Sequence, residues 1–326
     1  NNYIETLWWI LSTLYKKGYL YQSVSIQPYS PAAGTGLSSH ELNQPGTYKD
    51  VKDTSVVAMF KAIASAESQF IFDAAAANTL TNEVYYMAWT TTPWTLPSNL
   101  GLTVGPNIEY ALIATYNPYT AMPVNVIVAK ALVSKYFKEE GLSLTSFAEG
   151  DKVLPWKELA TFKGSQLDGL RYEQLMPFEA NNPANIEGDP FKIILGDFVT
   201  TEDGTGIVHT SPAFGADDYK VGQKNNLGII TLVDREGKFI DGVGEFAGRF
   251  VKNYKDEKDF QDVNVDISVK LKKENRAFKV EKYEHNYPHC WRTDKPILYY
   301  PLDAWFIKTT AVKERMVELN KTINWK

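Results

Sequence analysis

The first apolar pattern along the chain has the period of an α-helix. Between residues 2 and about 17, apolar side chains recur every three or four positions, at Ile4, Leu7, Trp8, Leu11, Leu14 and Tyr15. This spacing predicts an amphipathic helix that packs on an apolar surface, and Gly18 directly after it is typical of a helix C-terminus. A second helix is predicted over about 311–320, where one face carries Val312, Met316 and Leu319.

Between about residues 55 and 251 the pattern changes to short apolar runs that are typical of strands. The predicted strands cover 55–60, 84–90, 111–114, 125–129 and 191–195. A hairpin is predicted next, in which 198–201 and 206–209 flank a turn at 202–204. Strands at irregular spacing with short helices between them favour an α+β fold with a barrel-like domain.

Composition limits the class of protein. The chain has 326 residues, of which 44% are hydrophobic and 22% are charged, as in ordinary globular proteins. This length exceeds most single domains, so we expect one large domain with a smaller appendage. No apolar run reaches the roughly 18 residues of a membrane span. The chain opens without a starting Met or a leader, so we expect a segment of a longer protein rather than a signal peptide.

Charge and cysteine content exclude further classes. The net charge of −5 argues against a strongly basic protein that binds nucleic acid without regard to sequence. The single cysteine, Cys290, excludes an internal disulfide and fits a reducing cytoplasm. His285 and His289 lie near it, but a structural zinc takes four ligands, usually with paired cysteines, so no metal is expected. One local basic strip is either a solvated face or a nucleic-acid contact: Lys270, Lys272, Lys273, Arg276, Lys279 and Lys282.

The segment at 89–99, Trp-Thr-Thr-Thr-Pro-Trp-Thr-Leu-Pro-Ser-Asn, carries the first candidate chemistry. Thr90, Thr91 and Thr92 place three hydroxyls at the end of a predicted strand, which Pro93 stops. Threonine is also common in strands because it is β-branched, so a structural role is the alternative.

The segment at 204–219 carries the second candidate chemistry. His209 closes a predicted strand, where a lone histidine is more often structural. Asp217 and Asp218 stand where a helix should begin, so one of them is expected to be its N-cap. Hydroxyls, an imidazole and a carboxylate at strand ends can together form a polar pocket for a small, positively charged, ester-linked group.

These two segments resemble the editing region, connective polypeptide 1, of isoleucyl-tRNA synthetases, which are class I enzymes. Residues 209–212 (His-Thr-Ser-Pro) and 91–95 (Thr-Thr-Pro-Trp-Thr) are isoleucyl-like. In place of 91–95, valyl relatives tend to have Thr-Thr-Arg-Pro-Glu-Thr and leucyl relatives tend to have Thr-Thr-Arg-Pro-Asp-Thr. Three further stretches agree, at 27–38, 168–172 and 287–292. The resemblance covers nearly the whole chain and implies a barrel-like editing domain with flanking helical connecting segments.

The resemblance also implies roles for the threonine-rich segment. The hydroxyls of Thr90, Thr91 and Thr92 would hold the attacking water and the terminal ribose. Trp94 would form a wall of the pocket for the amino-acid side chain. Asn99 matches a position of the same motif, and a turn or N-cap residue is an equally good interpretation of it.

For the later segment, the resemblance implies that His209 fixes the ester or limits the size of the pocket. Asp218 would bind the α-ammonium group of the misattached amino acid. We expect the N-terminus of the following helix to help keep this carboxylate ionised.

The function implied is hydrolytic editing of valine joined to the isoleucine tRNA, and also of valyl adenylate. A pocket can use the one methylene by which valine and isoleucine differ for only about 1–3 kcal/mol of discrimination, and this enzyme family is the standard example. Sequences of the His-Ile-Gly-His and Lys-Met-Ser-Lys-Ser types are missing. We therefore expect no cofactor here, with ATP and Mg used by the parent synthetase elsewhere.

The implied partners are the acceptor end of tRNA(Ile), valine as the editing substrate and the catalytic core of the same polypeptide, in the cytoplasm. The implied organisation is a connecting segment over 1–54, an editing domain over 55–279 and a returning segment over 280–326. Two alternatives stay open: a valyl-type editing domain that removes threonine, and a non-catalytic tRNA-binding module.

Overall fold

The computed structural model describes residues 1–148 and 150–324. The helices are α1 (Asn2–Lys16), α2 (Ser39–Leu42), α3 (Gln69–Ala75), α4 (Val133–Tyr136), α5 (Gly164–Leu167), α6 (Ala216–Lys224), α7 (Val263–Lys273) and α8 (Lys313–Asn320). The strands are β1 (Leu20–Ser30), β2 (Thr35–Gly36), β3 (Tyr48–Lys61), β4 (Val84–Thr90), β5 (Gly101–Val104), β6 (Glu109–Tyr116), β7 (Pro123–Ala129), β8 (Lys157–Lys163), β9 (Lys192–Leu195), β10 (Ile207–Thr210), β11 (Ala277–Pro288) and β12 (Leu298–Ile307).

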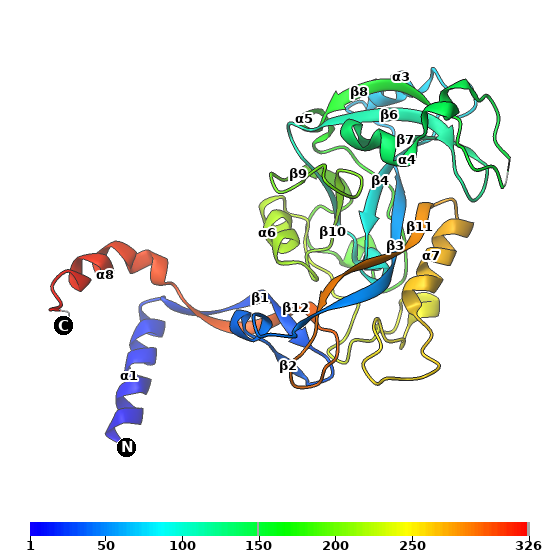
Figure 1. Cartoon of the computed structure of the whole chain (residues 1–326). Coiled ribbons are helices and arrows are strands. Elements are labelled where there is room, and N and C mark those ends of the chain that lie inside the picture. Colours follow the sequence, from blue (N-terminus) through cyan, green and yellow to red (C-terminus); the bar gives the residue numbers. More distant parts are fainter. Residues whose placement is uncertain (149, 325–326) are drawn as a thin grey trace.

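The main body is a mixed sheet of nine strands. Its path runs β8-β6-β7-β4-β10-β5-β9, with β3 on the other edge of β4 and β11 beyond β3. Figure 1 shows that β6, β7 and β8 cross the top of the body while β3, β4 and β10 run down it, so the sheet curls strongly. The expected α+β class with a barrel-like centre is confirmed, the centre being a curled sheet.

The sheet curls around strand β4. One of its edges pairs with β3, antiparallel, along residues 85–90. Its other edge pairs first with β7, at residues 84–86, and then with β10, at Trp89. Both neighbours are parallel to β4, and they follow each other along one edge. The sheet therefore splits beside the C-terminal end of β4, where the threonine-rich segment begins.

The core lies on both sides of the central strands. Residues 56–60 of β3 and 84–88 of β4 are buried without alternation. Continuous apolar runs of this kind are typical of strands that are covered on both faces. The ends of these strands are consequently held in a rigid body.

A second, three-stranded antiparallel sheet lies apart from the first, in the order β12-β1-β2. The long antiparallel pair β3–β11 runs from the large sheet toward it, and α1 and α8 lie beyond it (Figure 1). The predicted boundaries at residues 54 and 280 fall inside β3 and β11. The three-part division of the chain stays a prediction.

Several predicted elements are confirmed. The first helix is α1, and Gly18 follows it with a φ of 71°, the left-handed conformation that ends helices. None of the residues of α1 is buried. The predicted strands at 55–60, 84–90, 111–114, 125–129 and 191–195 lie in β3, β4, β6, β7 and β9. The last predicted helix is α8.

The predicted hairpin at 198–209 is wrong. Residues 207–210 form β10, but 198–201 form no strand. The physical reason is that β10 already has a partner on each edge, β4 at Val208 and β5 along its length. Residues 196–206 form a loop instead, with Gly204 and Gly206 at φ values of 69° and 73°. Among the described residues, no helix has both the length and the apolar character to cross a membrane.

Candidate functional site

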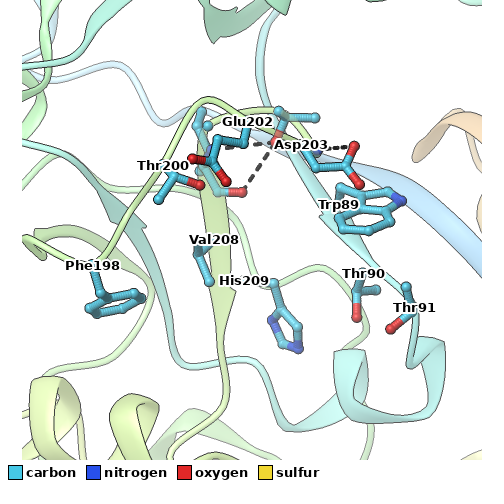
Figure 2. A pocket seen from close by; sticks show the side chains of 13 residues that line it. Trp89, Thr90, Thr91, Phe198, Thr200, Glu202, Asp203, Val208 and His209 are labelled. Carbon is cyan, nitrogen blue, oxygen red and sulfur yellow. Dashed lines mark hydrogen bonds between the residues drawn. The ribbon is translucent and has the colours of Figure 1, made fainter. Parts of the chain in front are cut away.

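A cavity of about 410 Å³ opens where the sheet splits. Its volume lies in the range of about 300–1,000 Å³ that is typical of small-ligand sites. The end of β4, strand β10 and the 196–206 loop line it (Figure 2). Thr90, Thr91 and His209 lie at one end of the cavity, and Glu202 and Asp203 of the loop lie at the other (Figure 2).

The cavity brings together three of the seven predicted site residues. Thr90, Thr91 and His209 line it, because Trp89 and Val208 pair in parallel and so place the next residue of each strand at the same level. The other four predicted residues are not among those that line it: Thr92, Trp94, Asn99 and Asp218.

The threonine hydroxyls form a connected cluster. The Oγ1 of Thr90 accepts a hydrogen bond from the backbone N–H of Thr92 at 3.1 Å and lies 3.2 Å from the Oγ1 of Thr92. The Oγ1 of Thr95 donates to the backbone carbonyl of Thr92 at 2.8 Å. Thr92 is therefore held by its neighbours on both sides, behind the hydroxyls that face the cavity.

His209 is built into this cluster through both ring nitrogens. Its Nε2 lies 3.0 Å from the Oγ1 of Thr95, and its Nδ1 lies 2.8 Å from the Nδ2 of Asn99. The residue is only 7% exposed. Burial lowers the pKa of the imidazole to about 3, so the ring is neutral at physiological pH.

Asn99 connects His209 to the core. Its Nδ2 also donates to the carbonyl of Gly101 at 2.8 Å, and its Oδ1 accepts from the Oη of Tyr172 at 2.7 Å. Asn99 thus contacts His209 and not the cavity, and its role in the site stays a prediction. Sequence reasoning missed Thr95 and Tyr172, although each lies inside a stretch that carried the family resemblance.

Trp94 lies in the core. It is 3% exposed, its ring centroid is 4.8 Å from that of Phe214, and its backbone N–H donates to the Oδ1 of Asn264 at 3.0 Å. Its side chain does not line the 410 Å³ cavity. A role for Trp94 in selecting the amino-acid side chain stays a prediction.

Asp218 lies in the first turn of α6. The N-cap of α6 is Gly215, so the expectation that Asp217 or Asp218 caps the helix is wrong. The Oδ2 of Asp218 accepts from the backbone N–H of Ser211 at 2.8 Å, across the turn that leads from β10. An added Cβ at Gly215 would lie 2.9 Å from the Cγ of Asp218, so any larger residue here would require this carboxyl to shift.

Burial acts against the ionisation of Asp218. Burial raises its pKa to about 6, against the hydrogen bond from Ser211, which lowers it, while Asp217 adds a smaller upward shift. Desolvation thus outweighs the hydrogen bond from Ser211, although a carboxyl with this pKa is still mostly ionised at neutral pH. Asp217 points outward and pairs with Lys220 at 3.1 Å.

The other candidates of the sequence are engaged in local contacts. The Nε2 of His285 lies 3.0 Å from Asp53, and the Nδ1 of His289 lies 2.9 Å from a backbone carbonyl. Within 1–148 and 150–324, no three His, Cys, Asp or Glu side chains are placed to hold a metal ion. In the basic strip, Lys270, Arg276 and Lys279 pair with acidic side chains, as on a solvated face.

Comparison with known proteins gives the family. The family described as tRNA synthetases class I (I, L, M and V) matches residues 1–326. The chain belongs to the class I tRNA synthetases.

Similar sequences agree with this assignment. An isoleucine–tRNA ligase of Cytophaga hutchinsonii is 55% identical, over 100% of this chain and 30% of its own length. Ligases of the same name from Bacteroides fragilis and Thermoplasma acidophilum are 52% and 42% identical, over 100% of this chain and 30% and 26% of their own lengths. The chain thus spans about 30% of the curated relatives it matches. The resemblance to isoleucyl-tRNA synthetases that the motifs indicated is confirmed.

Solved structures with a similar outline include the crystal structure named GlLeuRS-CP1, with a TM-score of 0.48 at 16% identity, over 70% of this chain and 98% of that one. A Plasmodium knowlesi cytosolic leucyl-tRNA synthetase editing domain has a TM-score of 0.45 at 12% identity, over 71% and 97%. The fold class rests on the strand order described above.

Proposed function

We propose that the cavity at the split of the sheet hydrolyses the ester of mischarged tRNA(Ile), and that its substrate is valyl-tRNA(Ile). The observation that carries this proposal is the hydrogen-bonded cluster of Thr90, Thr92, Thr95, Asn99 and His209 beside a cavity of ligand size, in a chain of the class I synthetase family. Such a cluster is rigid, polar and uncharged, and it suits an ester and a water molecule.

His209 acts as a wall and not as a base. The Nδ1 of His209 faces the Nδ2 of Asn99, which only donates, so Nδ1 is unprotonated and the proton of the neutral ring is on Nε2. Nε2 therefore donates to Thr95 and cannot take a proton from it. This arrangement argues against Thr95 and His209 as a nucleophile and base pair, although their separation of 3.0 Å would suit one.

The reaction is then the attack of a positioned water on the ester carbonyl. The new C–O bond forms to water, the bond to the ribose oxygen breaks, and that oxygen leaves with a proton that comes from the water. The hydroxyls of Thr90 and Thr91 are the groups that would orient the water and the ribose. Positioning and hydrogen bonding to the developing charge supply the acceleration.

Asp218 is the group that we assign to the α-ammonium, on the family resemblance, although its side chain does not line the 410 Å³ cavity. Among the residues that the structure describes, none donates a hydrogen bond to its second carboxylate oxygen, so that oxygen retains acceptor capacity. An ammonium group beside it would lower its pKa from about 6 and favour the ionised form. The ammonium group of the substrate would thereby supply the positive partner of the Asp218 carboxylate.

The wider setting follows from the same proposal. The partners are the acceptor end of tRNA(Ile) and the catalytic core of the ligase, in the cytoplasm. This chain is the deacylase part of the ligase, while ATP and Mg serve the amino-acid activation carried out by the rest of the parent protein. Valyl adenylate is a second substrate of the same cavity.

The test is deacylation of valyl-tRNA(Ile) and isoleucyl-tRNA(Ile) by this chain, with isoleucine-dependent pyrophosphate exchange measured alongside. We expect hydrolysis of the valyl ester, little hydrolysis of the isoleucyl ester and no exchange above background. Equal hydrolysis of both esters, or hydrolysis of neither, would contradict the proposal. A preference for threonyl esters on a valine tRNA would favour a valyl-type editing domain instead.

A further inference from the structure

Tyr172 ends the hydrogen-bonded chain that begins at the cavity. Its hydroxyl donates to the Oδ1 of Asn99 at 2.7 Å, and the residue is 1% exposed. The ring is held edge-to-face against Phe60 and Phe191, with centroids 5.3 and 6.3 Å away. Packing therefore fixes the position of the hydroxyl oxygen, and Tyr172 is not among the residues that line the cavity.

The direction of each bond in the chain follows from Tyr172 and one backbone carbonyl. The carbonyl of Gly101 only accepts, so the amide nitrogen of Asn99 must face it, and the amide oxygen must then face Tyr172. The second amide hydrogen points at the Nδ1 of His209. The ring is thereby left with one neutral tautomer, protonated on Nε2, which donates to Thr95.

The opposite arrangement would disturb the threonine cluster. If the amide of Asn99 turned over, its oxygen would face Nδ1, and the proton would have to move there from Nε2. Nε2 would then accept from Thr95, whose only hydroxyl hydrogen now bonds the carbonyl of Thr92 at 2.8 Å. Thr92 would lose that contact, and its own contact with Thr90 lies directly beside the cavity.

We propose that Tyr172 is a positioning residue, which through Asn99 holds His209 in its Nε2-protonated tautomer and so fixes the threonine cluster at the cavity. This inference rests on the proposed function of the cavity. None of the residues at 168–172 touches the cavity. The inference nevertheless gives this stretch a part in the same reaction.

The test is Tyr172→Phe, which removes one oxygen and keeps the ring. Tyr119→Phe is the matched control. The hydroxyl of Tyr119 accepts a hydrogen bond from the N–H of Val280 at 2.8 Å and takes no part in the hydrogen bonds that link Tyr172 to Thr95. Histidine is labelled with ¹⁵N in the whole chain, which has four histidines, and the His209 signals are assigned by their loss in His209→Gln. The ¹⁵N shifts of a protonated and an unprotonated ring nitrogen are widely separated, so they report the tautomer directly.

We expect a single Nε2-protonated tautomer in the wild type and in Tyr119→Phe. In Tyr172→Phe the carbonyl of Gly101 still orients the amide, but the Asn99 oxygen has lost its donor, so we expect the second tautomer to become detectable beside the first. Deacylation of valyl-tRNA(Ile) should fall in Tyr172→Phe alone, by up to about ten-fold, in proportion to the share of molecules that leave the Nε2-protonated tautomer and its ordered threonine cluster. A single unchanged tautomer in Tyr172→Phe, or an unchanged rate, would overturn the inference. The tautomer needs no turnover to be measured, so an inactive wild type with the expected shifts would instead contradict the proposed function.

Discussion

His209 and Asp218 stand at the two ends of one ten-residue segment, and burial acts on them in opposite directions. It lowers the pKa of the His209 imidazole to about 3 and raises that of the Asp218 carboxyl to about 6. Both nitrogens of His209 have partners within the protein, whereas Asp218, among the described residues, accepts one hydrogen bond, from the backbone N–H of Ser211. Contacts within the protein thus engage both ring nitrogens of His209, whereas we propose that a ligand engages the carboxyl of Asp218.

This difference separates two roles that sequence alone assigns to one pocket. A neutral ring with both nitrogens engaged can only bound the cavity and hold its neighbours in place. A carboxyl that burial makes reluctant to ionise gains most from a cation, because the cation restores the charged form. Under the proposed function, selection by size and capture of charge therefore belong to different residues.

The largest effect is expected for Asp218→Ala. A charge-assisted hydrogen bond to the α-ammonium contributes about 1.5–3 kcal/mol, so deacylation of valyl-tRNA(Ile) should fall roughly ten- to a hundred-fold. N-acetyl-valyl-tRNA(Ile) has no positive charge, and its slow hydrolysis should barely change. Asp218→Asn is the matched variant, because it keeps the shape and loses the charge. Near-normal activity of Asp218→Asn on the free ester would remove the ammonium-binding role.

The raised pKa of Asp218 should also make the folding stability of the protein depend on pH, and Asp218→Asn should remove that dependence. The folded pKa of about 6 lies above the usual value near 3.9, so the wild type loses stability as pH rises through this window. Asp218→Asn has no such loss, and above about pH 6 it should be more stable by about 1–3 kcal/mol. Chemical denaturation at pH 4 and pH 8 measures this. An equal difference at both pH values would contradict it.

His209 should have the opposite pH dependence. Its folded pKa of about 3 lies below the usual 6.5, so the unfolded chain takes up a proton first and stability falls as pH decreases from 6.5 toward 3. In the wild type this trend opposes that of Asp218 between about pH 4 and 6. In Asp218→Asn the opposing contribution is absent. The loss of folding stability that His209 causes as pH falls should therefore be steeper than in the wild type, and easier to measure.

Replacing His209 tests whether its side chain limits the size of the cavity. His209→Ala should enlarge the cavity and reduce the preference for the valyl over the isoleucyl ester by about ten-fold, since one methylene is worth about 1–3 kcal/mol. The measurement is the ratio of kcat/KM for the two esters. A variant that loses hydrolysis of both esters equally, while it stays folded, would indicate that His209 takes part in the chemistry.

The smallest effect is expected for Gly215→Ala. Gly215 has a φ of −147°, which alanine adopts freely, so the added methyl group acts only by its contact with the Asp218 carboxyl. Moving that carboxyl by a few tenths of an ångström should slow deacylation of the free valyl ester a few-fold, by the sensitivity of bound geometry to small displacements. The N-acetylated ester is the control. Equal slowing of both esters would point to a general disturbance of α6.

Much of this site was predictable from local patterns. The Pro-stopped threonines and the strand-ending His209 meet because their strands pair in parallel at Trp89 and Val208. The course of the 196–206 loop was not predictable, because the partners of β10 come from distant parts of the chain. The same holds for Tyr172, which lies 73 residues from the Asn99 that it contacts. The high pKa of Asp218 depends on burial, which no local pattern reports.

The most direct test of this division of roles is the pH dependence of kcat/KM for valyl-tRNA(Ile) deacylation, corrected for spontaneous hydrolysis. The value should rise through about pH 6 as Asp218 ionises and fall near pH 8 as the substrate loses its ammonium proton. Asp218→Asn should abolish the lower ionisation, and His209→Gln should retain it. A lower ionisation that disappears in His209→Gln and persists in Asp218→Asn would contradict the account.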